Sequence, residues 1–306
     1  MKKTISVWMM VLCCLASLTA QEKIYLWEAD KMPNSRHLGL QDSIANERVY
    51  QVAVPWIEYF PAPADNNSGA AVMIIPGGGY ARLAYVVSGI DLAKWFNSQG
   101  MHAFVLYHRL PISPDLFQRE IAPLQDAQRA LRVIRSRAQA WGINPSKVGV
   151  MGSSAGAHLA STVGTHDEDV SIFSDHLDEV PYRPDFMILV SPVISLEDAA
   201  ITHKGSRDNL LGKEADAALL AEYSSDKRVD ATTPPAIMFH ANNDRSVSSL
   251  NSIRFYEAMK ANKREASLHI FPQGGHSISL EPQPGTTQYW SSIAIDWLRE
   301  INILEK

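Results

Sequence analysis

The residues with the clearest chemical meaning are Gly152-Ser-Ser-Ala-Gly156, a G-x-S-x-G pattern. An apolar run, Lys147–Met151, precedes it, and a helix-like run, Ala155–Ser161, follows it. In this strand–turn–helix setting the pattern is typical of a nucleophile elbow, a sharp turn that exposes one serine hydroxyl. Glycines allow the chain to reverse against neighbouring backbone, because they carry no Cβ. The pattern therefore predicts that the hydroxyl of Ser154 is a nucleophile.

A serine hydroxyl is a poor nucleophile at neutral pH and needs a base, which a carboxylate in turn orients. In the arrangement that accompanies this elbow, the carboxylate and then the histidine follow the serine along the chain. His276 is the predicted base, since it lies in a Gly-rich loop after the last expected strand. Asp244 is the predicted carboxylate, because it follows the expected strand Ala236–His240 through a short polar turn. Asp226 and Asp230 are alternatives that precede that strand.

Five other histidines fit the role of base less well. His158 follows the serine by four residues on the same expected helix, which carries it away from the hydroxyl, so we expect it to pack or cap. His240 precedes the predicted carboxylate, and His269 lies inside an expected strand. His166 and His176 lie near carboxylates without the spacing of a metal motif, and we expect them in solvated loops. The sequence predicts no metal site.

The segment Pro76-Gly-Gly-Gly-Tyr80 follows another apolar strand-like run. Consecutive glycines let the backbone turn its N–H groups toward a developing oxyanion. We predict Gly78, Gly79 and Ala155 as the amide donors, with Tyr80 able to replace one of them. The ring of Tyr80 is also the predicted contact for a sugar. A plain Gly-rich turn is the alternative, whereas a dinucleotide loop is excluded because G-x-G-x-x-G is not matched.

Composition limits the class of protein. The chain has 306 residues, of which 46% are hydrophobic and 20% charged, and its net charge is −5. This length and apolar content favour one large α/β domain, which we place at residues 21–306. Nucleic acid is not an expected partner, because no basic stripe is present.

The first twenty residues resemble an export signal. Lys2-Lys3 form a charged start, Ile5–Leu18 is apolar, and Ala20 offers a small residue at a cleavage site. The apolar run is short for a membrane span, so none is predicted. Both cysteines, Cys13 and Cys14, lie in this segment, so residues 21–306 contain no disulfide. A lipid anchor on one of these cysteines is the alternative to cleavage, and an exported periplasmic or extracellular protein is the interpretation.

Strands and helices alternate along the remaining chain. Short apolar runs rich in β-branched or aromatic residues predict strands at Gln51–Tyr59, Ala70–Ile75, His102–Tyr107, Lys147–Met151, Phe186–Val190, Ala236–His240 and Ser267–Phe271. Helical spacing of apolar residues predicts helices at Ile90–Gln99, Ile121–Trp141, Ala155–Gly164, Ala215–Tyr223, Leu250–Asn262 and Thr287–Ile301. Such alternation implies an α/β fold with a mostly parallel sheet covered on both faces. Ligands of such sheets bind beyond the carboxyl ends of the strands, where the motifs above lie.

Some conspicuous side chains have structural explanations. Asp126 and Arg129 lie three residues apart on an expected helix, so we expect a structural ion pair. Trp27 and Trp290 are expected in the core, where large aromatic side chains bury most area.

Together these features resemble the α/β-hydrolase superfamily, from about Val49 to the C-terminus. Within it the chain is similar to a bacterial esterase branch that includes acetylxylan esterases and proteins often labelled xylanase-like. The segments that carry this resemblance are Pro76–Tyr80, Tyr107–Leu110, Asp126–Arg132, Gly152–Leu159, Pro234-Pro235, His240–Asp244 and Gly274–His276. Three positions depart from the usual pattern. Pro76 stands where lipase-like relatives have His, His108 where the branch has Tyr, and Ser277 where it has Gly.

The resemblance implies a serine esterase that needs no cofactor and removes acetyl groups from xylan or xylo-oligosaccharides. The substrate follows from the resemblance alone.

A feruloyl esterase or a general carboxylesterase is the first alternative, and a peptidase is less compatible because such peptidases carry a large extra domain. A non-enzymatic carbohydrate-binding protein is the second alternative. A glycosidase is the third, although that chemistry usually needs two carboxylates facing the scissile bond. Oligomeric state is not readable from the sequence.

Overall fold

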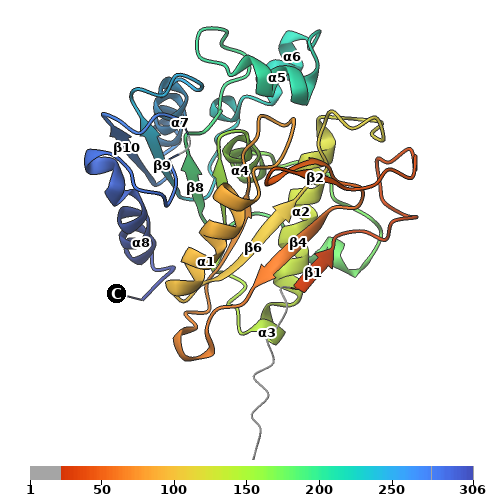
Figure 1. The fold of residues 1–306 in the computed structure, drawn as a ribbon, viewed down its shortest axis with the longest axis horizontal. Helices are drawn as coiled ribbons and strands as arrows, with labels where there is room; N and C mark the ends of the chain where they lie inside the picture. Colours follow the sequence, from red (N-terminus) through yellow and green to blue (C-terminus); the bar gives the residue numbers. More distant parts are fainter. Residues whose placement is uncertain (1–21, 277, 306) are drawn as a thin grey trace, which may run out of the picture.

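The fold is built on one central sheet, seen in a computed structural model that describes residues 22–276 and 278–305. The expected export segment, both cysteines and Ser277 lie outside the described residues. The sheet has eight strands in the order β1-β4-β6-β5-β7-β8-β9-β10 (Figure 1). The strands are β1 (Glu22–Tyr25), β4 (Trp56–Phe60), β5 (Ala71–Ile75), β6 (His102–Tyr107), β7 (Val148–Ser153), β8 (Met187–Val190), β9 (Ala236–Ala241) and β10 (Ala266–Phe271). A separate hairpin joins β2 (Ser43–Ala45) to β3 (Arg48–Gln51).

Strand direction divides the sheet into two parts. From β6 to β10, in spatial order, every neighbouring pair is parallel. Strand β4 runs antiparallel to both β6 and β1 at the other edge. The prediction of a mostly parallel sheet is therefore confirmed, and the carboxyl ends of β5, β7, β9 and β10 meet at one edge.

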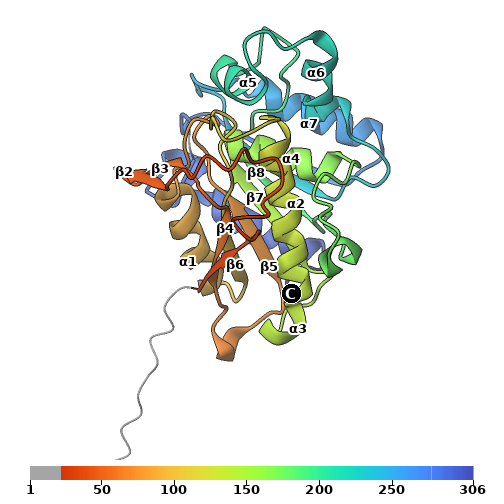
Figure 2. The same ribbon diagram turned by 90° about the vertical axis from the view of Figure 1, so that its right-hand side faces the viewer.

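Helices cover both faces of the sheet (Figures 1 and 2). One face carries α1 (Asp91–Ser98) and α8 (Trp290–Glu300), whose side chains share one apolar cluster. The other carries α2 (Ile121–Ser136), α4 (Ala155–Thr165) and α7 (Leu250–Ala261), whose side chains share a second cluster. Because both faces are covered, the parallel strands are apolar at nearly every position rather than at alternate ones.

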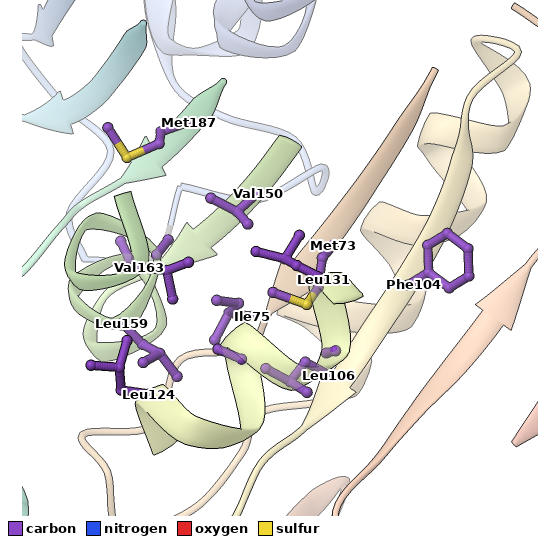
Figure 3. Close-up of a cluster of buried hydrophobic side chains, with 14 of the residues drawn as sticks. Met73, Ile75, Phe104, Leu106, Leu124, Leu131, Val150, Leu159, Val163 and Met187 are labelled. Carbon is purple, nitrogen blue, oxygen red and sulfur yellow. The ribbon is translucent and has the colours of Figure 1, made fainter. Parts of the chain in front are cut away.

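Alternation along β5 shows how the two apolar clusters divide. Met73 and Ile75 belong to the cluster under α2 and α4, where Figure 3 shows them beside Leu131. Val72 and Ile74 point to the opposite face and belong to the cluster under α1 and α8. Successive strand residues point to opposite faces, so one short apolar run contributes to both cores.

Two expected elements are broken in the structure. The expected strand Gln51–Tyr59 is divided between β3 and β4, with Pro55 before the start of β4. Proline has no N–H for a sheet ladder, which accounts for a strand start rather than a strand centre. The expected helix Ile121–Trp141 ends at Ser136, and a short α3 (Ala138–Trp141) follows it.

The expected ion pair between Asp126 and Arg129 is wrong. Asp126 is fully buried and pairs with Arg109 at 2.7 Å, and it also accepts a hydrogen bond from the indole of Trp27. Arg129 instead pairs with Asp175. Helical spacing places two residues on one face, but longer-range partners decide their contacts. Trp27 and Trp290 are buried, as predicted.

A segment that we call the cap, residues 203–222, lies at the top of Figure 1 beyond α4 and β8. It contains α5 (Lys204–Leu211) and α6 (Ala217–Glu222). Helix α6 lies within the predicted helix Ala215–Tyr223, whereas α5 was not predicted. Within residues 22–276 and 278–305, no helix is long and apolar enough to span a bilayer.

Candidate active site

The turn between β7 and α4 holds Ser154 in an unusual backbone conformation. Its φ is 57° and its ψ is −121°, a region that non-glycine residues occupy only when the surrounding structure imposes it. The surroundings are close. A Cβ on Gly152 would lie 2.3 Å from the carbonyl oxygen of Gly156, and one on Gly156 would lie 2.1 Å from that of Ile75. The two glycines of the motif are therefore required by packing, and they keep the serine at the tip of the turn.

Three predicted side chains form one hydrogen-bonded chain. The hydroxyl of Ser154 lies 2.9 Å from Nε2 of His276, whose Nδ1 lies 2.7 Å from Oδ2 of Asp244. A carboxylate can only accept, so Nδ1 carries the proton and donates to Asp244. Nε2 is then left with a lone pair that accepts the serine proton. The residues come from the ends of β7, β9 and β10, so the sheet edge brings them together.

The loop that carries the carboxylate is braced by its own backbone. Oδ1 of Asp244 accepts from the amides of Ser246 at 2.8 Å and Val247 at 3.0 Å. The neighbouring Asn243 accepts from the amide of Gly275 at 2.9 Å, which ties this loop to the one that carries the histidine. These contacts fix the distance between acid and base without long side chains.

A second histidine also contacts the carboxylate. Nε2 of the buried His240 lies 3.3 Å from Oδ2 of Asp244 and 3.1 Å from the carbonyl oxygen of Val247, while its Nδ1 faces the hydroxyl of Ser252. Burial alone would raise the pKa of Asp244. Hydrogen bonds from His240, His276 and the Val247 amide outweigh burial and hold that pKa below its ordinary value. Asp244 is therefore ionised throughout the neutral range.

The glycine segment after β5 bends past the serine. Gly78 and Gly79 have φ values of 143° and 65°. A Cβ on Gly78 would lie 2.0 Å from the carbonyl oxygen of Arg82, so this position accepts no larger residue without distortion. Ala155 begins α4, and the first amides of a helix have no partner within that helix. Gly78 and Gly79 line the same cavity as Ser154, and Ala155 follows it in the chain, whereas the role of their amides as donors remains a proposal.

The predicted sugar contact of the Tyr80 ring does not fit its position. Tyr80 is 3% exposed, and its hydroxyl donates to Nδ1 of His158 at 2.8 Å. Burial raises the pKa of Tyr80 well above its usual value. The ring packs against the rings of His108 and His158, and residue 80 has a left-handed φ of 61°. The packing role expected for His158 is confirmed by this contact and by its 2.8 Å bond to the carbonyl oxygen of Tyr223.

The alternative acids have other surroundings. Asp230 accepts from Thr232 and Thr233 in a local turn, and burial raises the pKa of Asp226. Asp244 alone of the three predicted carboxylates bonds to His276. The expectation of a solvated loop is wrong for His166, which is buried beside Tyr223, and it agrees with the exposed His176.

A cavity of about 350 Å³ opens in front of Ser154. Glycines 77–79 line it, together with Ser154 and His276, which we call the core wall, and His203, Gly205 and Asn209 of the cap, which we call the cap wall. Two arginines, Arg48 and Arg82, also line it, but no Asp or Glu does among the described residues. A larger cavity of about 640 Å³ lies under the N-terminal segment and does not include the serine.

Sequence reasoning missed the cap residues of this cavity. His203 belongs to no motif, and the cap composition around it is polar, so neither spacing nor apolar pattern pointed to it. Asn209 donates to the carbonyl oxygen of Gly79 at 2.8 Å, a contact across 130 positions that no local pattern reveals. Within the described part of the chain, no group of three or more His, Cys, Asp or Glu could hold a metal ion.

Comparison with known proteins identifies relatives. The family model described as BD-FAE matches residues 59–259. A crystal structure of an acetyl ester-xyloside bifunctional hydrolase from Caldicellulosiruptor lactoaceticus is 33% identical, covers 93% of this chain and 97% of its own, and superimposes with a TM-score of 0.79.

Two curated proteins match a similar region. An acetylxylan esterase from Xylanibacter ruminicola is 40% identical over 222 residues, which are 71% of this chain and 42% of that protein. An endo-1,4-beta-xylanase B from Butyrivibrio fibrisolvens is 32% identical over 237 residues, 77% of this chain and 37% of that protein. The chain therefore spans less than half the length of either curated relative.

Proposed function

Because this chain belongs to the BD-FAE family and has the α/β-hydrolase fold, we propose that it is a serine esterase that removes acetyl groups from carbohydrate. The observation that carries the proposal is the hydrogen-bonded chain Ser154–His276–Asp244, whose serine and histidine line a cavity. The proposed substrates are acetylated xylan or xylo-oligosaccharides, which agrees with the activity named for the Xylanibacter relative.

The proposed reaction begins with attack by the serine oxygen on the ester carbonyl carbon. Nε2 of His276 takes the hydroxyl proton as the Oγ–C bond forms. Asp244 keeps the imidazole in the tautomer that can accept this proton and stabilises the resulting imidazolium. The carbonyl oxygen becomes negative and is stabilised by the amides of Gly78, Gly79 and Ala155.

Collapse of this intermediate breaks the bond to the sugar oxygen. His276 returns its proton to that oxygen, so the sugar leaves as an alcohol and acetyl remains on Ser154. Water then attacks the acyl-enzyme, His276 takes one of its protons and returns it to Oγ, and acetate is released. The two halves use the same groups, and the cycle requires no external electron donor or acceptor.

Glycoside hydrolysis is a second reaction named for relatives of this chain. Most such reactions need two carboxylic groups on either side of the scissile bond. The cavity in front of Ser154 has no Asp or Glu in its described lining, and Asp244 lies behind His276. Ester hydrolysis is therefore the reaction that this cavity supports. Feruloyl and other carboxylic esters differ in the acyl group and remain alternatives within the same mechanism.

The proposal is tested by acetate release from acetylated xylo-oligosaccharides, with Ser154→Ala as control. We expect release by the wild-type protein and a fall of about 10⁴-fold or more in the variant, since the attacking oxygen is removed. Release that persists in a purified, folded Ser154→Ala protein would refute the mechanism. Cleavage of 4-nitrophenyl acetate but of no sugar acetate would preserve the mechanism and refute the substrate.

We also propose that residues 1–20 direct export to the periplasm or the exterior of a bacterial cell. The charged start, short apolar run and Ala20 support this proposal. N-terminal sequencing of the protein recovered outside the cytoplasm should begin at Gln21. An intact N-terminus on cytoplasmic protein would contradict it.

A further inference from the structure

His203 is a cap residue of the cavity that holds the reacting groups. It lies at the start of α5 and lines the same cavity as Ser154 and His276. Its Cε1 would lie 3.9 Å from a Cβ on Gly79, which places the ring next to the glycine segment. No step of the proposed mechanism uses this side chain.

The hydrogen bonds of His203 determine which ring nitrogen carries the proton. Nδ1 accepts from the amide of Ser206 at 3.2 Å and faces the hydroxyl of Ser206 at 2.8 Å. A nitrogen that accepts a backbone N–H has no proton of its own, so the proton of the neutral ring is on Nε2. Burial lowers the pKa of His203, and the nearby His276 lowers it further, which keeps the ring neutral at pH 7. The ring therefore has one fixed N–H donor, at Nε2.

The cap that carries this donor is tied to the glycine segment. Asn209, on the same helix, donates to the carbonyl oxygen of Gly79. His203 also caps the helix through Ser206, so its ring cannot rotate without losing that bond. The donor thus has a defined position relative to the nucleophile, as required of a group that orients a ligand.

We propose that His203 binds the alcohol part of the substrate, donating through Nε2–H to a hydroxyl oxygen next to the ester being cleaved. The proposal rests on the esterase function proposed above and narrows it to esters of polyols. A donor is suited to this place because sugar hydroxyls accept hydrogen bonds in almost every orientation, whereas a simple alkyl alcohol offers no such oxygen. His203 is thus a substrate-binding residue and does not transfer the reacting proton.

Two acetate esters that differ in one hydroxyl test this role. They are trans-2-hydroxycyclohexyl acetate and cyclohexyl acetate. We expect the wild-type kcat/KM to be about tenfold higher for the hydroxyl ester, the effect of one buried hydrogen bond. In His203→Asn the preference should fall to about twofold or less. Asparagine keeps the helix cap, because its side-chain oxygen accepts from the amide that His203 now caps, but it lacks a donor at the position of Nε2.

The matched control is His176→Asn, a change at an exposed histidine outside the cavity lining, which should leave the preference unchanged. An equal fall on both esters in His203→Asn would overturn the inference, because it would indicate a structural role. A wild-type enzyme that cleaves both esters without preference would also overturn it. Failure of the wild-type protein to cleave either ester or 4-nitrophenyl acetate would instead refute the esterase function, and this inference with it. Cleavage of 4-nitrophenyl acetate but of neither cyclohexyl ester would overturn this inference alone.

Discussion

The two walls of the cavity are built differently. Helix α4, which carries the elbow, is buried at every residue from Ala155 to Thr165, and the serine amide bonds to the carbonyl oxygen of Val190 in β8. Helix α6 of the cap has no buried residue, and α5 buries Ser206, Leu210 and Leu211. Segments with little burial open at lower free energy than core segments. The comparison indicates that the core positions the reacting groups. The proposed contact with the leaving group comes from the cap, which has few buried residues.

The largest expected effect lies on the core wall. Asp244→Asn should lower kcat by about 10⁴-fold, because the amide favours the wrong tautomer of His276. The fold should survive, since asparagine is nearly isosteric. Steady-state rates and circular dichroism of the purified variant measure both. A rate near that of the wild type would contradict the assignment of Asp244.

The glycine segment between the two walls offers a matched pair. Gly78→Ala should lower kcat by about 10²-fold, because the new Cβ would meet the carbonyl oxygen of Arg82 and displace the amides. Gly79→Ala should lower kcat by about tenfold or less. A Cβ there would lie 3.9 Å from Cε1 of His203, an ordinary van der Waals distance, although an alanine at a φ of 65° would strain the backbone.

Rates of both variants on 4-nitrophenyl acetate test this order. Equal losses would show that backbone strain, rather than the steric contact at residue 78, controls the segment.

A smaller effect is expected where the cap meets the glycine segment. Asn209→Ala removes the bond to Gly79 and should lower kcat/KM about threefold to tenfold, the effect of one hydrogen bond at a partly exposed site. The preference for the hydroxyl ester should decrease with it, because the donor of His203 loses its fixed position. Unchanged kinetics on both esters would show that α5 is held by its apolar residues alone.

Acid should destabilise the core through its buried histidines. Burial lowers the pKa of His102, of His158 and of His166 to about 4 each. Their unfolded forms bind a proton below about pH 6.5 while the folded forms stay neutral, so stability present above that pH is lost as pH falls toward 4. Each histidine should lower the free energy of unfolding by about 1 kcal/mol at about pH 5.5. Thermal unfolding between pH 7 and pH 5 measures this loss, and an unchanged Tm would contradict it.

The sequence predicted the core wall well because its signals are local. Ser154 is identified by two glycines and a strand-to-helix turn, and His276 by a glycine loop after a strand. The break at Pro55 was missed, although proline is disfavoured inside a central strand. The burial of Tyr80 was also missed, because its contacts with His108 and His158 depend on packing. His203 and Asn209 were also missed, since their contacts arise only when the cap meets a segment more than a hundred positions earlier in the chain.

The distance along the chain between the reacting groups has a consequence for biosynthesis. Ser154 and His276 are 122 positions apart, and the strand that positions the histidine is the last of the sheet. A growing polypeptide that has reached the serine therefore has the nucleophile but no base to activate it. Such a nascent chain cannot hydrolyse esters by this mechanism until residue 276 has been synthesised and β10 has paired with β9. The order of the elements thus delays activity until β10 and the loop that carries His276 have been synthesised.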